Sequence, residues 1–169
     1  MMHAFQDREN LYLIMELMPG GDLRYHISKK RRFNEEQTSN ISIKSDDFLK
    51  FFIIEFFVGC IVQGLEYLHM NGCIHRDIKP ENLVLDSKGY VRITDLGIAR
   101  IWRPENSSDT SGTPGYMAPE VMCRQNHGVA VDYFALGVMA YEFMMGRVKI
   151  LIKVTYLTKI CLASLSRQI

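Results

Sequence analysis

The amino-acid sequence predicts an α+β fold that is mostly helical and carries a few short strands. Two stretches are apolar and long enough to form buried helices, namely residues 48–69 and 131–145. Two shorter apolar runs, residues 11–17 and 83–86, are bounded by turn-forming residues and have the length of strands. The chain has 169 residues, which is enough for one compact domain.

The first short run, residues 11–17 (LYLIMEL), ends at a Pro-Gly-Gly sequence, so we expect a buried strand that ends in a turn. Asp22 then stands where it can cap a short helix that ends near Ser28. The basic residues 29–32 come next. Such a run could bind phosphate, but a solvated helix end next to a favourable dipole is the preferred interpretation.

The first long helix is expected to follow a break in the helical pattern. Asn34 and the two glutamates after it indicate a helix start, but residues 39–47 are rich in β-branched and turn-favouring residues. The helical pattern resumes near Phe48, and Asn71-Gly72 marks its end.

Two elements are expected in the second half of the chain. Residues 83–86 and 90–94 are separated by Ser-Lys-Gly, which predicts two short strands around a tight turn. In residues 131–145 only Asp132 and Glu142 are charged. A helix without a polar face is expected to be buried on every side.

The composition excludes several classes of protein. Apolar residues make up 47% and charged residues 23%, which excludes a disordered chain. Twenty Lys and Arg against 19 Asp and Glu leave a formal charge of +1, so neither nucleic acid nor an anionic membrane is an expected partner. The four cysteines have no zinc-binding spacing, which favours a reducing, intracellular and cytoplasmic setting.

No secretory signal and no membrane span are expected. Residues 1–10 have no apolar core. Residues 48–62 form the most apolar stretch, but Lys50 and Glu55 interrupt it. The stretch is also shorter than the roughly 20 apolar residues that a span needs. A buried helix is therefore the preferred interpretation.

The motif that carries chemistry lies in residues 73–85 (CIHRDIKPENLVL). It contains His-Arg-Asp at residues 75–77, followed by Lys79 and then by Asn82, five places after the aspartate. The spacing H-R-D-x-x-x-x-N arises by chance about once in 10⁵ positions. Taken alone, an Asp or Asn in a loop is more often a turn former, so the assignment depends on the shared spacing.

Two further motifs follow in order, Asp-Leu-Gly at residues 95–97 and Ala-Pro-Glu at residues 118–120. Through these motifs the chain resembles the eukaryotic Ser/Thr protein kinases, over about residues 5–147. The resemblance implies a kinase-like α+β fold that consists mostly of the helical large lobe, with the hinge and a remnant of the small lobe. Leu96 replaces the phenylalanine usual in D-F-G and can fill the same apolar position.

The resemblance implies transfer of the ATP γ-phosphoryl group, with Mg²⁺, to Ser or Thr of protein substrates. Asp77 would accept the proton of the attacking hydroxyl and orient it. Lys79 would place a positive charge at the γ-phosphate. Asn82 and Asp95 would supply oxygen ligands for Mg²⁺.

The resemblance also implies nucleotide contacts near the hinge. Met15 would be the gatekeeper, the backbone of Glu16 and Met18 would pair with adenine, Asp22 and Glu81 would contact ribose or substrate, and Val84 would form the floor of the adenine pocket. For Met15 and Val84, plain core packing is the alternative, because adenine pockets are also apolar.

Further roles are implied around the catalytic loop. Thr113 would help to dock the substrate, with its hydroxyl between Asp77 and Lys79. Asp132 would hold the backbone of the catalytic loop, which is a structural role.

The loop before Thr113 contains candidate phosphorylation sites. Kinases with an arginine before the catalytic aspartate, here Arg76, often use it to bind a phosphate in this loop. Ser108 and Thr110 are the favoured acceptors, ahead of their neighbours Ser107 and Ser111. Asp109 could instead supply a weaker, permanent charge, and an unmodified polar loop is the remaining alternative.

Three acidic residues indicate a preference for basic substrates. Glu142, Glu81 and Asp22 match positions that read arginines upstream of the phosphorylated residue in the cyclic-AMP-dependent kinase. Together with the Gly-Thr-Pro-Gly-Tyr sequence, they suggest an AGC-like, basophilic kinase.

The chain departs from the family pattern in three places. No glycine-rich loop, V-A-I-K lysine or αC glutamate precedes the hinge, so residues 1–147 are expected to form a partial kinase domain. Joining Thr38 directly to Phe56 restores an ordinary helix, which suggests that residues 39–55 are an insertion. Residues 148–169 match nothing in the family, and a non-native terminus is preferred over an amphipathic membrane segment.

Two other functions stay open at this stage. Without the small-lobe phosphate contacts, the chain could be a pseudokinase-like module that binds partners without catalysis, or a truncated product that does not fold stably. The intact set of Asp77, Lys79, Asn82 and Asp95 favours catalysis. The sequence predicts no oligomeric state.

Overall fold

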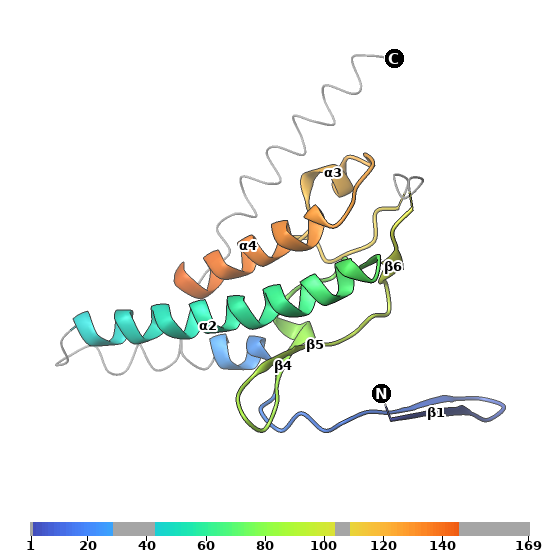
Figure 1. Ribbon diagram of the computed structural model, residues 1–169, viewed down its shortest axis with the longest axis horizontal. Helices are drawn as coiled ribbons and strands as arrows, with labels where there is room; N and C mark the ends of the chain where they lie inside the picture. Colours follow the sequence, from blue (N-terminus) through green and yellow to red (C-terminus); the bar gives the residue numbers. More distant parts are fainter. Residues whose placement is uncertain (1, 29–42, 104–108, 146–169) are drawn as a thin grey trace, which may run out of the picture.

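The computed structural model describes residues 2–28, 43–103 and 109–145. Figure 1 shows two long helices, α2 (Ile43–Met70) and α4 (Ala130–Met145), and a hairpin that projects away from them. The predicted α+β fold, mostly helical with a few short strands, is confirmed.

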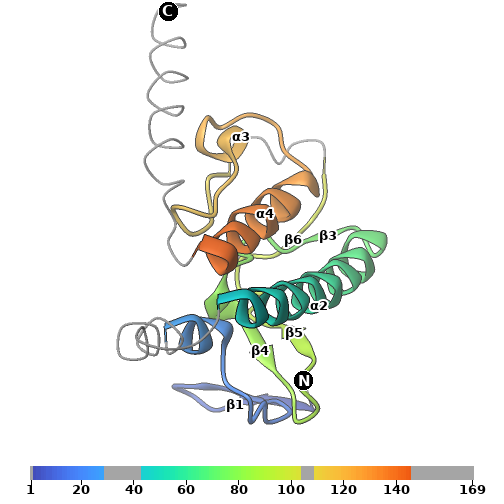
Figure 2. The ribbon, with the colours of Figure 1, turned by 90° about the vertical axis from the view of Figure 1, so that its left-hand side faces the viewer.

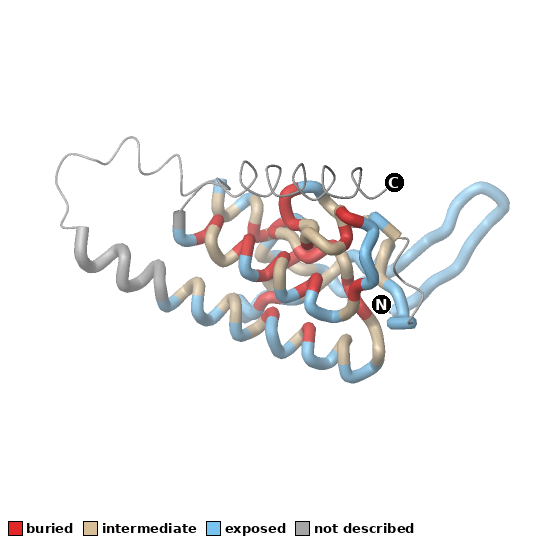
Figure 3. Tube along the Cα trace, turned by 90° about the horizontal axis from the view of Figure 1, so that it is seen from above, coloured by how far each residue is buried: buried red, intermediate tan, exposed pale blue. Residues whose placement is uncertain are grey.

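The projecting hairpin consists of β1 (His3–Gln6) and β2 (Leu11–Ile14), paired antiparallel. The Asp7 carboxylate accepts hydrogen bonds from two backbone N–H groups of the turn, which fixes the hairpin. The expectation of a buried strand over residues 11–17 is wrong, because the strand ends at Ile14 and is exposed (Figure 3). Among the described residues only β1 pairs with β2, so its apolar side chains are not covered.

A short helix, residues 23–28, follows the irregular segment after β2 and begins as expected. The Asp22 carboxylate accepts a 2.7 Å hydrogen bond from the backbone N–H of Tyr25, which is the contact of a helix cap. Just before it, the Gly20 N–H donates to the carbonyl of Leu85 at 3.0 Å. A Cβ at Gly20 would lie 2.4 Å from the Leu85 Cβ, so only glycine permits this approach.

Helix α2 begins earlier than expected, at Ile43, although residues 39–47 were expected to break the helical pattern. It runs without interruption through the described part of the suspected insertion, residues 43–55. A continuous helix neither supports nor contradicts an insertion, so the insertion of residues 39–55 stays a hypothesis. The helix ends as predicted, because Gly72 adopts a φ of 70° and its N–H donates to the His69 carbonyl at 2.9 Å.

Several expectations concern residues that the structure does not describe. The basic run 29–32, the helix start at Asn34 and the tail 148–169 all lie outside the described residues.

The C-terminal part of α2, Phe52–Met70, is long and apolar enough to cross a membrane, judged by length and composition alone. This is weak support for a span, because core helices pass the same test. In this structure, one side of α2 packs on α4 and on the hairpin formed by β4 (Leu83–Leu85) and β5 (Val91–Ile93). Figure 2 shows α4 above α2 and this hairpin below it.

The core therefore lies between α2, α4 and the β4–β5 hairpin (Figure 3). Its fully buried members include Leu23, Ile61, Leu65, Ile78, Leu83 and Met139. The short helix α3 (Pro119–Met122) covers the start of α4 through a second apolar cluster.

Helix α4 is buried on most of its surface, but the expectation of burial on every side is wrong. Tyr133, Gly137 and Met144 are exposed. Their spacing of four and seven residues places them on one stripe of the helix. This stripe is exposed, although the Tyr133 ring lies edge-on against the His69 ring of α2, with 5.2 Å between the ring centroids.

Candidate active site

The loop of residues 75–82 carries most of the predicted catalytic residues, and α4 fixes its backbone. The two carboxylate oxygens of Asp132 accept hydrogen bonds from the backbone N–H groups of His75 (2.9 Å) and Arg76 (2.7 Å). Asp132 is fully buried, and the His69 ring lies 2.8 Å from the same carboxylate. Arg76 has a φ of 68°, a costly conformation for a residue other than glycine, so these bonds hold the loop in an unusual shape.

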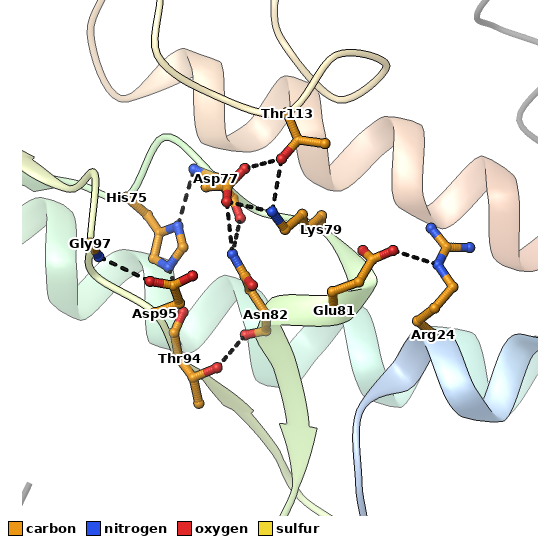
Figure 4. A network of polar contacts seen from close by, with 10 residues as sticks. All are labelled: Arg24, His75, Asp77, Lys79, Glu81, Asn82, Thr94, Asp95, Gly97 and Thr113. Carbon is orange, nitrogen blue, oxygen red and sulfur yellow. Dashed lines mark hydrogen bonds and ion pairs between the residues drawn. The ribbon is translucent and has the colours of Figure 1, made fainter. Parts of the chain in front are cut away.

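Asp77 is nine-tenths buried and lies at the centre of a polar network (Figure 4). Its Oδ2 accepts hydrogen bonds from Lys79 Nζ at 2.7 Å and from Asn82 Nδ2 at 3.0 Å. Its Oδ1 accepts a hydrogen bond from the Thr113 hydroxyl at 2.5 Å. Both oxygens of the carboxylate thus have donors.

This network decides the ionisation state of Asp77. Burial by itself would raise the pKa of the carboxyl, but hydrogen bonds from Lys79 and Thr113, and the Lys79 charge, hold that pKa below its usual range. Asp77 is therefore a carboxylate at neutral pH and can accept a proton.

Thr113 connects the loop before α3 to the catalytic loop. Its hydroxyl oxygen accepts a 2.8 Å hydrogen bond from Lys79 Nζ and donates to Asp77, so it lies between the two side chains as the resemblance implied. Its part in docking a substrate stays a prediction.

Asn82 and Asp95 come from different segments that are joined at the backbone. The Asn82 carbonyl accepts hydrogen bonds from the N–H (2.9 Å) and the hydroxyl (3.1 Å) of Thr94, the residue before Asp95. Asp95 is exposed, has a φ of 62°, and its Oδ1 accepts a 3.1 Å bond from the Gly97 N–H. The Asn82 amide therefore contacts Asp77 directly, whereas Asp95 is linked to Asn82 only through the backbone of Thr94, and its own side chain bonds to Gly97 (Figure 4).

These two residues fit a magnesium ion that is bound partly by other ligands. Within the described part of the chain, no three His, Cys, Asp or Glu side chains cluster as a metal site would require. An amide oxygen and a carboxylate are the ligands that Mg²⁺ prefers, and it usually takes its remaining ligands from water and substrate phosphates. Asn82 and Asp95 could thus hold Mg²⁺ together with a nucleotide.

Of the residues implied for adenine, Met15, Glu16 and Met18 lie on the segment between β2 and the helix 23–28, whereas Val84 lies on β4. Met15 is 64% exposed, so the alternative of core packing does not apply to it, and Glu16 is exposed as well. Met18 and Val84 are half-buried, and Asp22 forms a β-bridge with Val84. The nucleotide contacts of these residues stay predictions.

Arg76 makes no hydrogen bond to Thr110, the one favoured phosphorylation site within the described residues. Ser108 lies outside the described residues, and Thr110 is exposed. Arg76 donates instead to the carboxylate of Asp109 at 2.7 Å and, through two other nitrogens, to the carbonyl of Ile98. The aspartate between the two candidates is thus the residue that reaches Arg76.

Asp109 has further partners. Arg100 Nη2 lies 3.0 Å from its Oδ2, while the N–H and the hydroxyl of Ser111 donate to its Oδ1 at 3.0 Å and 2.6 Å. An acidic residue within a Ser/Thr-rich loop was the sequence signal, but sequence spacing could not say which residue would reach the arginine.

The predicted acidic residues Glu81 and Glu142 lie on either side of a residue that the sequence did not single out. Arg24, on the helix 23–28, donates to Glu81 Oε1 at 2.7 Å and to Glu142 Oε1 at 2.7 Å. It also donates to the hydroxyl of Tyr116 at 2.6 Å, and this hydroxyl donates to Glu142 Oε2 at 2.5 Å. The third predicted acid, Asp22, caps the helix and is not part of this cluster.

Comparison with known proteins agrees with the resemblance. The protein kinase domain family matches residues 1–153. A probable serine/threonine-protein kinase of Dictyostelium discoideum is 36% identical over 147 residues, which is 86% of this chain and 29% of the relative. The cAMP-dependent protein kinase catalytic subunit of Dictyostelium discoideum is 40% identical over 144 residues, 85% of this chain and 19% of the relative.

The human RAC-beta serine/threonine-protein kinase is similar as well, with 40% identity over 151 residues, 86% of this chain and 27% of the relative. The chain thus spans less than a third of the length of these three relatives. Since the family match covers all of the described residues and most of the chain, the chain belongs to the protein kinase family.

Proposed function

We propose that the site transfers the γ-phosphoryl group of ATP to the hydroxyl of Ser or Thr in protein substrates. The observation that carries the proposal is the hydroxyl of Thr113 bound to the ionised carboxylate of Asp77. It demonstrates that Asp77 can accept a hydrogen bond from an alcohol in this setting, which is what a base acting on a substrate hydroxyl has to do.

In the proposed reaction, the substrate oxygen forms a bond to the γ-phosphorus while the bond to the bridging β–γ oxygen breaks, and Asp77 takes the hydroxyl proton. Lys79, with its ammonium 2.7 Å from Asp77, is placed to neutralise charge on the transferred group. Asn82 and Asp95 would hold Mg²⁺, which when bound neutralises the phosphate oxygens.

We also propose that the substrates carry basic residues near the phosphorylated residue. The support is the position of Glu81, four residues after Asp77 on the catalytic loop, and of Glu142 beside it. Two carboxylates next to the reacting groups attract a guanidinium or ammonium group of the substrate.

The test uses a chimeric chain in which the small lobe of a relative precedes residue 1, assayed with Mg·ATP and Ser/Thr peptides. Asp77→Asn should lower the rate by about 10²- to 10⁴-fold and leave Mg·ATP binding unchanged, because Asp77 acts on the hydroxyl. Asp95→Asn should instead weaken Mg²⁺ binding. An equal loss of nucleotide affinity in both variants would contradict this division of roles, and an inactive parent chimera would overturn the proposed function.

A further inference from the structure

The cluster formed by Arg24, Glu81, Glu142 and Tyr116 has the composition of a binding site for a guanidinium group that is already filled. The two carboxylates and the phenol oxygen accept hydrogen bonds from three different nitrogens of Arg24. A planar guanidinium with several donors matches such a set of acceptors better than an ammonium does.

The position of the cluster connects it to the catalytic loop. Glu81 belongs to the short 3-10 helix Pro80–Asn82, which also carries Asn82 of the active site. Tyr116 stands three residues after Thr113, whose hydroxyl contacts Asp77. Figure 4 shows the Glu81–Arg24 pair of this cluster on the same side of the catalytic loop as Lys79. A substrate that places its hydroxyl at Asp77 therefore has the cluster within reach of neighbouring side chains.

The exposure and the charge of the cluster indicate that another cation can displace Arg24 from the two carboxylates. The side chain of Glu142 is 5% exposed, but those of Arg24 and Glu81 are 31% and 45% exposed, so the cluster opens to solvent on one side. Two carboxylates face a single guanidinium, which leaves one net negative charge to attract a second cation. Burial by itself would lower the pKa of Arg24, but the hydrogen bonds to Glu142 and Glu81 outweigh it and raise the pKa, so Arg24 is charged at every physiological pH.

We propose that Arg24 is an internal occupant of the acidic site, and that a basic side chain of a substrate binds there only by displacing it. The inference rests on the proposed function, because it assigns the site to a substrate residue. Its consequence is a weakened preference for basic substrates. Selectivity is the difference in binding free energy between a substrate with the basic residue and one without it. When a substrate without the basic residue binds, Glu81 and Glu142 stay paired with Arg24, so this substrate is not penalised by unpaired carboxylates.

The first experiment asks whether the vacated site takes up an external guanidinium. In the Arg24→Ala variant of the 169-residue chain, about 10 mM methylguanidinium chloride should raise the midpoint temperature of thermal unfolding, compared with the same concentration of NaCl. The reason is that a ligand that binds the folded state stabilises it. The wild type should not respond. Arg92→Ala, which breaks the ion pair with Asp86 on the β4–β5 hairpin, is the matched control and should not respond either.

The second experiment measures selectivity in the chimeric kinase. Two peptides are compared that differ only by arginine or alanine two or three residues before the serine. Their ratio of kcat/KM should increase at least about tenfold in Arg24→Ala relative to the wild type and to Arg92→Ala. Arg24→Lys keeps the charge but cannot contact all three acceptors, so it should give an intermediate ratio. This variant replaces Arg24→Ala in the test if the alanine variant does not fold.

The outcomes separate the two proposals. Activity with an unchanged peptide ratio in Arg24→Ala and Arg24→Lys, together with no response to methylguanidinium, would overturn the inference, and Arg24 would be a structural ion pair only. Methylguanidinium binding to Arg24→Ala without any phosphorylation by the parent chimera would instead support the vacated site and overturn the proposed function.

Discussion

Asp109 holds a loop by means of one carboxylate. Ser111 and Arg76 keep the pKa of this carboxyl well below its usual range. Because the folded-state pKa is lowered, the pairing stabilises the fold at every pH above the unfolded value of about 4 and is lost as the pH falls through the lower folded value. Between pH 5 and 8 the charge that faces Arg76 is therefore permanent, whereas the charge of a phosphate would have to be added by a phosphorylation reaction.

We therefore expect the segment from Asp109 to Thr113 to be held without phosphorylation. In the chain treated with phosphatase, hydrogen exchange at the Ser111 amide should be slow, because this amide donates to Asp109. Asp109→Ala should accelerate it at least about tenfold. Asp86→Ala, which removes an aspartate–arginine pair on the β4–β5 hairpin, should leave it unchanged. Protection that appears only after phosphorylation of Thr110 or Ser111 would contradict this expectation.

At the scale of elements, local signals in the sequence identified where helices and turns begin and end. The cap at Asp22, the stop at Gly72 and the β4–β5 hairpin each depend on residues close in sequence, and the structure has all three. The exposure of β2 and of one stripe of α4 could not be predicted in this way. An apolar run indicates what can be buried, but whether a neighbouring element covers it depends on the tertiary arrangement.

Two glycines provide a test of this packing. Gly137 lies in the exposed stripe of α4, and a Cβ added there would meet no atom within 4 Å, so Gly137→Ala should stabilise the fold by about 0.5–1 kcal/mol through helix propensity. Gly20→Ala should destabilise it by more than about 1 kcal/mol, because the new Cβ would meet both the side chain and the backbone of Leu85. Urea denaturation measures both values, and equal effects would argue against the close approach at Gly20.

At the scale of the whole molecule, the active site is assembled from segments far apart in the chain. Motif spacing predicted Asp77, Lys79, Asn82 and Asp95 as a set, because the chemistry of phosphoryl transfer limits which residue types can stand at those distances. Arg24 escaped prediction because it stands 57 residues from Glu81 and 118 from Glu142 in sequence. Only the fold, which places the helix 23–28 beside the catalytic loop, brings these charges together.

Asp132 is the residue of α4 that holds the backbone of the catalytic loop, residues 75–82. Its two oxygens accept the N–H groups of His75 and Arg76, so Asp132→Asn, of nearly the same shape, would place an amide NH₂ against one of these donors. We expect a loss of about 1–3 kcal/mol in the free energy of unfolding, because a buried donor is left unsatisfied. Asp86→Asn is the matched control, since Asp86 also accepts two backbone N–H groups but at an exposed turn, and it should cost less than about 1 kcal/mol. Urea denaturation gives both values. If the two variants lost the same stability, the catalytic loop would not depend on α4 for its shape.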